Sequence, residues 1–143
     1  MNKPANPVET NDNLQEQAMQ RSNTDNAPRS AIHQTLYSAD TFVQHDYLAG
    51  KNLPDITRPQ EGQINWLHFV GINDVALLKH ALEPYGIHEL VIEDILSRKQ
   101  RPKIEDYGSY VFTAAQVYHY TSTGKLHSDQ VYVIIGKDFV LSF

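Results

Sequence analysis

Apolar residues follow a two-residue spacing in several segments of the chain, which is the spacing of β-strands. Residues 31–48 predict two short edge strands separated by a polar break at residues 38–40. Residues 64–70 predict a further strand, and the loop before it, residues 50–62, contains two prolines and two glycines. The buried surface of the strand over 64–70 is expected to come from Ile64, Trp66 and Phe69.

Two short helices are predicted after this strand. Residues 75–85 have apolar side chains at helical spacing, with Asn73 as the expected N-cap and Pro84 weakening the last turn. The second helix covers residues 87–96, and it ends before Pro102 because a proline disfavours helical geometry in the residue that precedes it.

Long apolar runs dominate the last third of the chain. Residues 110–120 predict a long strand, and as far as Ala115 both of its alternating faces are apolar or small, which is typical of a strand that is covered on both sides. Residues 131–135 show the same pattern, and residues 139–143 follow after a short turn at hairpin spacing. The sequence therefore predicts an α/β fold in which a mixed parallel and antiparallel sheet has helices packed on both faces.

The first 30 residues differ in composition from the rest. They contain no aromatic residue and are rich in Asn, Gln, Pro, Ser and Thr, so they cannot bury enough apolar surface to offset the entropy of ordering. We expect a disordered tail over residues 1–30 and one domain over residues 31–143. Because the sequence stops within an apolar strand, we expect it to be the front part of a longer protein.

Composition excludes several classes of function. The net charge of −5 offers no general attraction for nucleic acid, and the chain contains no cysteine to form disulfides or thiolate metal sites. The longest apolar stretch is far shorter than the roughly 20 residues needed to cross a bilayer, so the chain is expected to be soluble. It lacks HExxH, Gly-rich phosphate-binding and G-x-S-x-G motifs, so neither enzymatic activity nor a small-molecule substrate is expected.

Carboxylates on the predicted second helix are the main candidate for chemistry. Glu89 and Glu93 lie together opposite the apolar face, where their like charges destabilise the helix by about 0.2–0.5 kcal/mol. Asp94 lies within the apolar face and needs a partner. Positive charge can come from a divalent ion such as Mg2+, which needs only one or two carboxylates. It can also come from the basic residues that follow, which are Arg98, Lys99, Arg101 and Lys103.

The order and spacing of three short segments resemble the CorA family of divalent-cation channels. In that family a Leu-His-Pro-Leu-x-x-Glu-Asp segment precedes Gln-Arg-Pro-Lys. Here Ile-His-Glu-Leu at 87–90 and Glu-Asp-Ile-Leu at 93–96 precede Gln-Arg-Pro-Lys at 100–103. Glu89 departs from the common proline. The resemblance covers residues 64–143 well and residues 31–48 only loosely.

This resemblance implies a function. It identifies the chain as the N-terminal cytoplasmic domain of a Mg2+ or Co2+ channel in the inner membrane, a homopentamer whose identical subunits are its partners. Glu93 and Asp94 align with carboxylates that bind regulatory Mg2+ between neighbouring subunits. Their partner carboxylates, the stalk helix, the membrane helices and the Gly-Met-Asn motif do not occur in this sequence, so the chain itself is not expected to conduct ions.

Two alternatives remain open from the sequence. The seven histidines do not show the spacing of a dedicated zinc site, and His68, His80 and His88 are expected to be structural or exposed. A zinc-transporting branch of the same superfamily nevertheless fits the resemblance. The other alternative is a free-standing interaction module with no ion role. The sequence that follows Phe143 in the natural protein would distinguish this module from a channel domain.

Overall fold

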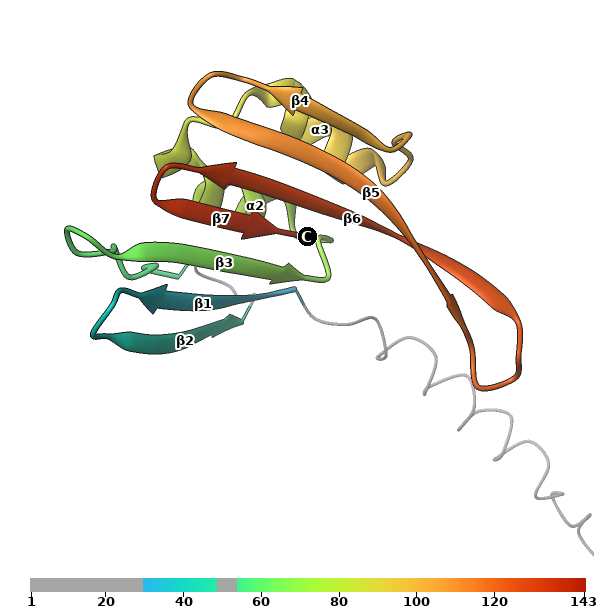
Figure 1. Ribbon diagram of the computed structural model, residues 1–143, viewed down its shortest axis with the longest axis horizontal. Coiled ribbons are helices and arrows are strands. Elements are labelled where there is room, and N and C mark those ends of the chain that lie inside the picture. The colour runs from blue at the N-terminus through green and yellow to red at the C-terminus, as the bar shows by residue number, and fades with distance from the viewer. Residues whose placement is uncertain (1–29, 49–53) are drawn as a thin grey trace, which may run out of the picture.

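A computed structural model describes residues 30–48 and 54–143, which form one seven-stranded sheet with two α-helices (Figure 1). The strand order is β2-β1-β3-β7-β6-β5-β4, and every neighbouring pair is antiparallel except β3–β7. The strands are β1 (Ala31–Tyr37), β2 (Phe42–Leu48), β3 (Ile64–Val70), β4 (Lys103–Asp106), β5 (Tyr110–Tyr120), β6 (Leu126–Gly136) and β7 (Phe139–Ser142). The helices are α2 (Val75–Leu82), the 3-10 turn η1 (Glu83–Tyr85) and α3 (Glu89–Ser97). The predicted mixed sheet is confirmed.

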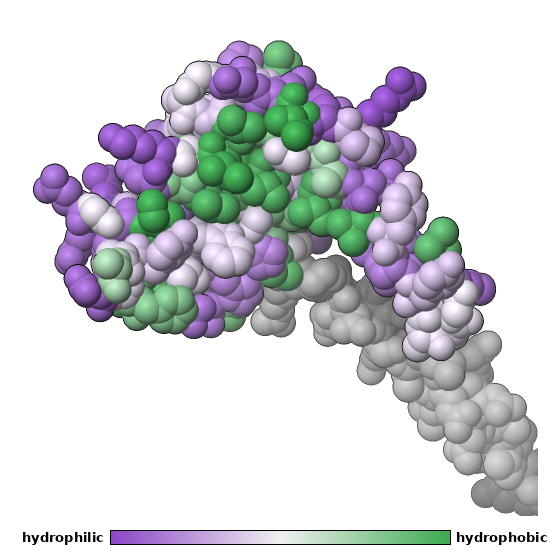
Figure 2. All heavy atoms as spheres, viewed as in Figure 1, coloured by the Kyte–Doolittle hydropathy of each residue, from purple (hydrophilic) through white to green (hydrophobic). Residues whose placement is uncertain are grey.

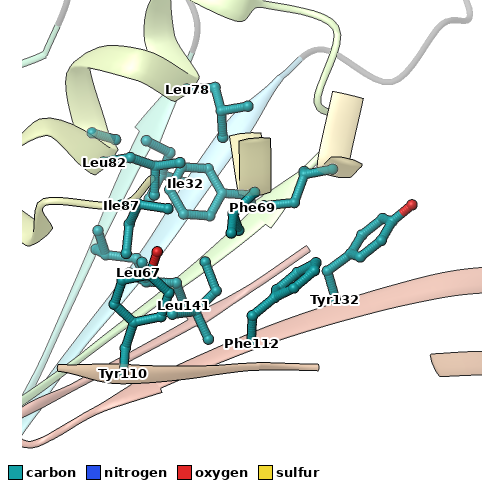
Figure 3. Packing of buried hydrophobic residues seen from close by; sticks show 14 of the residues in the cluster. Ile32, Leu67, Phe69, Leu78, Leu82, Ile87, Tyr110, Phe112, Tyr132 and Leu141 are labelled. Atoms are coloured by element: carbon teal, nitrogen blue, oxygen red, sulfur yellow. The ribbon is translucent and has the colours of Figure 1, made fainter. Parts of the chain in front are cut away.

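Both helices lie on the same face of the sheet. In Figure 1 they lie behind the strands, and Figure 3 shows side chains of the sheet meeting Leu78 and Leu82 of α2 in one cluster. The helices contribute Leu77, Leu78, Ala81, Leu82, Val91 and Ile95 to this cluster. The expectation of helices on both faces is therefore wrong for the described residues.

The opposite face of the sheet is apolar but open. Tyr110, Phe112 and Ala114 of β5 are buried, whereas Val111 between them is 36% exposed. Ile135 of β6, which is paired with Val111, is 52% exposed. Figure 2 views this face and shows apolar surface gathered over its middle. Strand β5 is therefore apolar on both faces, but the described residues cover only the face that carries the helices.

Strand β3 has the predicted bounds but a different buried face. Side chains alternate along a strand, so Trp66 and Phe69 cannot share a face. Leu67 and Phe69 point to the helices together with Asn65, while Trp66 is 43% exposed on the open face. Asn65 is buried because its side chain accepts a hydrogen bond from Gln34 Nε2 at 2.9 Å and donates one to the hydroxyl of Tyr85.

The remaining local predictions are largely confirmed, with three corrections. Strands β1 and β2 exist, but only β2 lies at an edge, because β1 also pairs with β3. The N-cap of α2 is Asp74 rather than Asn73, since the Asp74 carboxylate accepts the backbone N–H of Leu77 at 2.9 Å. Pro84 lies in η1, where the α-helix has already ended.

The predicted tail and loop fall mainly outside the part of the chain that the structure describes. Residues 1–29 and 49–53 are not described, so the predicted disorder of the tail stays a prediction. Ser30, which was assigned to the tail, is buried and its hydroxyl contacts the carbonyl of Gly71. Within residues 30–48 and 54–143, no helix is both long and apolar enough to cross a membrane.

Candidate functional site

Helix α3 carries the candidate carboxylates, and both its ends are fixed by specific contacts. His88 is the N-cap, and its Nδ1 accepts the backbone N–H of Leu90 at 3.1 Å. The backbone N–H of His88 donates to the hydroxyl of Tyr110 on β5 at 3.0 Å. The helix ends at Arg98, which has a left-handed backbone with φ 53°. Val91 and Ile95 are fully buried, so the orientation of α3 over the sheet is set by packing.

Asp94 has the partner that its position in the apolar face requires. Its Oδ2 accepts a hydrogen bond from Lys103 Nζ at 2.7 Å, and its Oδ1 accepts one from Gln100 Nε2 at 2.8 Å. The ion pair is largely shielded, because the two side chains are only 28% and 23% exposed. The expectation that Asp94 needs a compensating charge is confirmed, and within the described residues Lys103 provides it.

Lys103 is held by several groups on the helix-bearing face of the sheet. Besides Asp94, its ammonium donates to Glu105 Oε2 at 2.9 Å and lies 5.4 Å from the centre of the Phe112 ring. The hydrogen bond to Asp94 and then the one to Glu105 raise the pKa of Lys103. One cation thus balances two carboxylates, so this cluster retains a net negative charge.

Gln100 connects this cluster to strand β6. Its backbone N–H donates to Gln130 Oε1 at 3.1 Å, and its carbonyl accepts from Gln130 Nε2 at 2.7 Å. The nearby Tyr132 is almost fully buried, and its hydroxyl has no hydrogen-bond partner among the described residues. Burial and then the charge of Asp94 raise the pKa of Tyr132. Asp94 therefore lies beside buried polar groups rather than in open solvent.

Glu93 has a different environment from Asp94 although the two are adjacent in sequence. Successive residues of a helix point about 100° apart, so the neighbour of a residue that faces β4 lies on another side of the helix. Glu93 is exposed and lines a groove of about 640 Å3 between α2 and α3, together with Glu83, Glu89 and Lys79. Within residues 30–48 and 54–143, Glu89 and Glu93 have no hydrogen-bond or ion-pair partner.

The basic residues after α3 do not act as one cluster. Lys103 contacts Asp94, whereas Arg98 donates to the side-chain oxygen of Asn73 at 2.7 Å. Lys99 and Arg101 are exposed. The sequence indicated four candidate partners for the carboxylates, and the fold selects one of them because β4 brings Lys103 beneath α3.

The histidines singled out from the sequence have structural contacts. His88 caps α3, His80 Nε2 lies 3.0 Å from the carbonyl oxygen of Pro54, and His68 Nδ1 lies 2.9 Å from Ser142 Oγ.

Sequence reasoning missed a second group of histidines. His119 and His127 are opposite each other on β5 and β6. His119 lies two residues before the connection at residues 121–125 and His127 two residues after it, and this equal spacing was the available signal. Across the described residues, no group of three or more His, Cys, Asp or Glu side chains could hold a metal ion.

Comparison with known proteins places the domain in a class. No protein-family model matches the chain. The chain resembles the soluble domain of CorA from Methanocaldococcus jannaschii with a TM-score of 0.53, covering 78% of this chain and 39% of that one at 11% identity. The fold is therefore of the class found in the soluble domain of CorA.

Two curated relatives match the chain at higher sequence identity. The chain is 39% identical over 79 residues to the cobalt/magnesium transport protein CorA of Thermotoga maritima, covering 54% of this chain and 22% of that protein. It is 34% identical over 107 residues to the putative metal ion transporter YfjQ of Bacillus subtilis, covering 72% of this chain and 31% of that protein. The matched region thus spans between a fifth and a third of the length of these relatives. Over this region the chain is similar to CorA-type proteins.

Proposed function

We propose that this domain senses intracellular divalent cations, with Mg2+ as the main ion and Co2+ as an alternative, for a transporter of CorA type. The proposal rests on helix α3, which presents adjacent carboxylates in two different environments: Glu93 on an exposed acidic groove and Asp94 in a shielded, net-negative cluster. The similarity to CorA-type proteins and the cobalt/magnesium transport named for one relative support the choice of ion. The domain is assigned to the cytoplasmic side of the inner membrane.

The proposed ion is shared between identical subunits. A hydrated Mg2+ ion typically takes one or two carboxylates from a protein and keeps several waters. Glu93 is accessible for such an outer contact, while Asp94 is within reach only when Lys103 is displaced or moves aside. Carboxylates of a neighbouring subunit in the proposed homopentamer complete the site. Bound ions then hold adjacent subunits together, and loss of the ions leaves repulsion between carboxylates that favours opening.

Lys103 has a defined role in this proposal. Its ammonium neutralises Asp94 when no divalent ion is bound, so it acts as an internal competitor of the ion. Binding of Mg2+ to Asp94 must overcome this ion pair, which lowers the apparent affinity of the site. A low affinity suits a sensor that responds to high intracellular Mg2+ rather than one that is permanently occupied.

Limited proteolysis of the intact protein tests the proposed function. Mg2+ is expected to protect the wild-type assembly from cleavage, and the double substitution Glu93→Ala and Asp94→Ala is expected to weaken this protection. The double substitution Asp40→Ala and Glu61→Ala removes two exposed carboxylates away from α3 and serves as the control. Unchanged protection in the Glu93 and Asp94 variant would refute the assignment of the site.

A further inference from the structure

The groove between helices α2 and α3, the α2–α3 groove, has an apolar floor that the described residues leave partly uncovered. Val75 and Ala76 line it from α2 and are exposed, Val75 at 44%. Ile92 and Leu96 line it from α3 and are half-buried. Exposed apolar side chains that gather in one place mark surfaces that bind other apolar surfaces. This groove of about 640 Å3 is therefore a candidate interaction surface.

Acidic side chains surround the apolar floor of this groove. Glu83, Glu89 and Glu93 line it, whereas Lys79 is the one lysine or arginine among the lining residues. Within residues 30–48 and 54–143, no ion pair neutralises any of the three carboxylates. Glu89 and Glu93 also repel each other, because they are four residues apart on one helix. The groove therefore favours an occupant with positive charge and repels the phosphate groups of nucleic acid or anionic lipid.

Both walls of the groove are helices, and this restricts the shape of the occupant. Helices pair their backbone groups internally, so the walls offer no free strand edge to which an extended peptide could add. The side chains on the walls form ridges, between which the side chains of a third helix fit. Helices α2 and α3 have 8 and 9 residues. At 1.5 Å per residue they are about 12–13 Å long, which matches two to three turns of an occupying helix.

We propose that the α2–α3 groove binds a basic amphipathic helix of a partner protein. The apolar residues of that helix, spaced i, i+3, i+4 and i+7, pack on the apolar floor, and its Lys or Arg residues lie beside the carboxylates of the rim. A second copy of α2 or α3 is not a suitable occupant, because these helices carry the same excess of carboxylates. The groove shares Glu93 with the proposed ion site, but binding of a helix does not require an ion.

Fluorescence anisotropy of labelled synthetic peptides tests the proposal on the whole chain. The probe is a peptide of about 18 Leu and Lys residues, long enough to form a helix, with Leu at amphipathic spacing. Two controls are a scrambled peptide of the same composition without an apolar face and a peptide in which Glu replaces Lys. The amphipathic Leu-Lys peptide is expected to bind one per chain and at least tenfold more tightly than either control. Its affinity is expected to fall as salt is added, because salt screens the carboxylates.

Matched substitutions locate the binding site. Val75→Ser is expected to weaken binding of the Leu-Lys peptide by about threefold or more, because part of the apolar floor is lost. Val43 on β2 is 43% exposed, nearly the same as Val75, and Val43→Ser is expected to leave the affinity unchanged. Glu83→Gln is expected to weaken binding by about two- to fivefold. Glu61→Gln, at an exposed carboxylate outside the groove, is the control for that change in charge.

The outcome is independent of the proposed ion sensing. The measurements are made with EDTA present, and Glu83 is not part of the proposed ion site. Absence of binding, equal binding of the scrambled peptide, or equal affinities of the Val75 and Val43 variants would overturn the helix proposal and leave the proteolysis test of ion sensing untouched. Circular dichroism of each variant verifies that these exposed substitutions leave the fold intact.

Discussion

Lys103 Nζ lies 2.7 Å from Asp94 Oδ2, and this ion pair joins helix α3 to the edge strand β4. Among the described residues no other ion pair between a lysine or arginine and a carboxylate connects a helix to the sheet. The pair is also where the proposed ion must bind. The same contact therefore links the stability of the domain to its proposed ability to sense divalent cations.

The Asp94–Lys103 pair is expected to be strongly coupled in stability. Lys103→Met leaves Asp94 shielded without its cation and is expected to lower the free energy of unfolding by about 1–3 kcal/mol. Asp94→Asn is expected to have a similar effect, while the double variant loses less than the sum of the two. Urea denaturation of the four proteins in the double-mutant cycle measures the coupling. Lys99→Met, at an exposed lysine nearby, is the control, and additive effects at positions 94 and 103 would contradict the coupling.

The sequence predicted the bounds of the helices and strands better than the contacts between them. Helix α3 and strand β3 have nearly the predicted bounds, because capping residues, Gly71 and Pro102 act locally. The need of Asp94 for a partner also followed from its place on the helix. The choice of Lys103 over three other basic residues did not, because it depends on where β4 lies relative to α3, and that is a tertiary relationship.

The prediction of a sheet covered on both faces was wrong for a physical reason. A strand is expected to be buried on both faces when both are apolar, but β5 and β6 are apolar on a face that no described residue covers. Sequence alone does not distinguish surface that is covered by the same domain from surface that is left open. Trp66 was also expected in the buried surface of β3, but the polar side chain of Asn65 occupies the position on the helix side.

Ile134 and Ile135 provide a direct test of the one-sided sheet. They are neighbours on β6 with the same side chain, yet Ile134 is fully buried and Ile135 is 52% exposed. Ile134→Ala is expected to lower the free energy of unfolding by about 2–5 kcal/mol. Ile135→Ala is expected to cost about 1 kcal/mol or less, because little packing is lost. Trp66, the single tryptophan, reports unfolding by fluorescence, and equal losses at the two positions would mean that both faces are covered.

Tyr85 makes the domain sensitive to alkaline pH. Burial raises the pKa of Tyr85 from 10.0 to about 12, although the hydrogen bond from Asn65 opposes this shift. The unfolded chain therefore loses the phenolic proton first, so the stabilisation is complete below pH 10 and is lost as the pH rises towards 12. The loss is expected to be on the order of 2–3 kcal/mol. The raised pKa of Lys103 acts in the same direction.

Urea denaturation between pH 8 and pH 12 measures this effect. Tyr85→Phe is expected to be less stable than the wild type at pH 8, because Asn65 loses a partner, and to depend less on pH above 10. Tyr118→Phe, at a tyrosine that is 62% exposed, is the control and is expected to follow the wild-type curve. A Tyr85→Phe curve parallel to that of the wild type would show that Tyr85 does not carry the pH dependence.

Lys103 and Asp94 are expected to have opposite effects on Mg2+ binding, which separates ion sensing from stability. Lys103→Met removes the internal competitor of the ion, so the Mg2+ concentration for half-maximal protection from proteolysis is expected to fall severalfold even though the domain is less stable. Asp94→Asn removes the ligand and is expected to raise that concentration. Lys79→Met removes a cation from the rim of the α2–α3 groove and serves as the control for a general change in charge. Equal shifts in the Lys79 and Lys103 variants would indicate a long-range charge effect, and a loss of protection in Lys103→Met would contradict direct competition at Asp94.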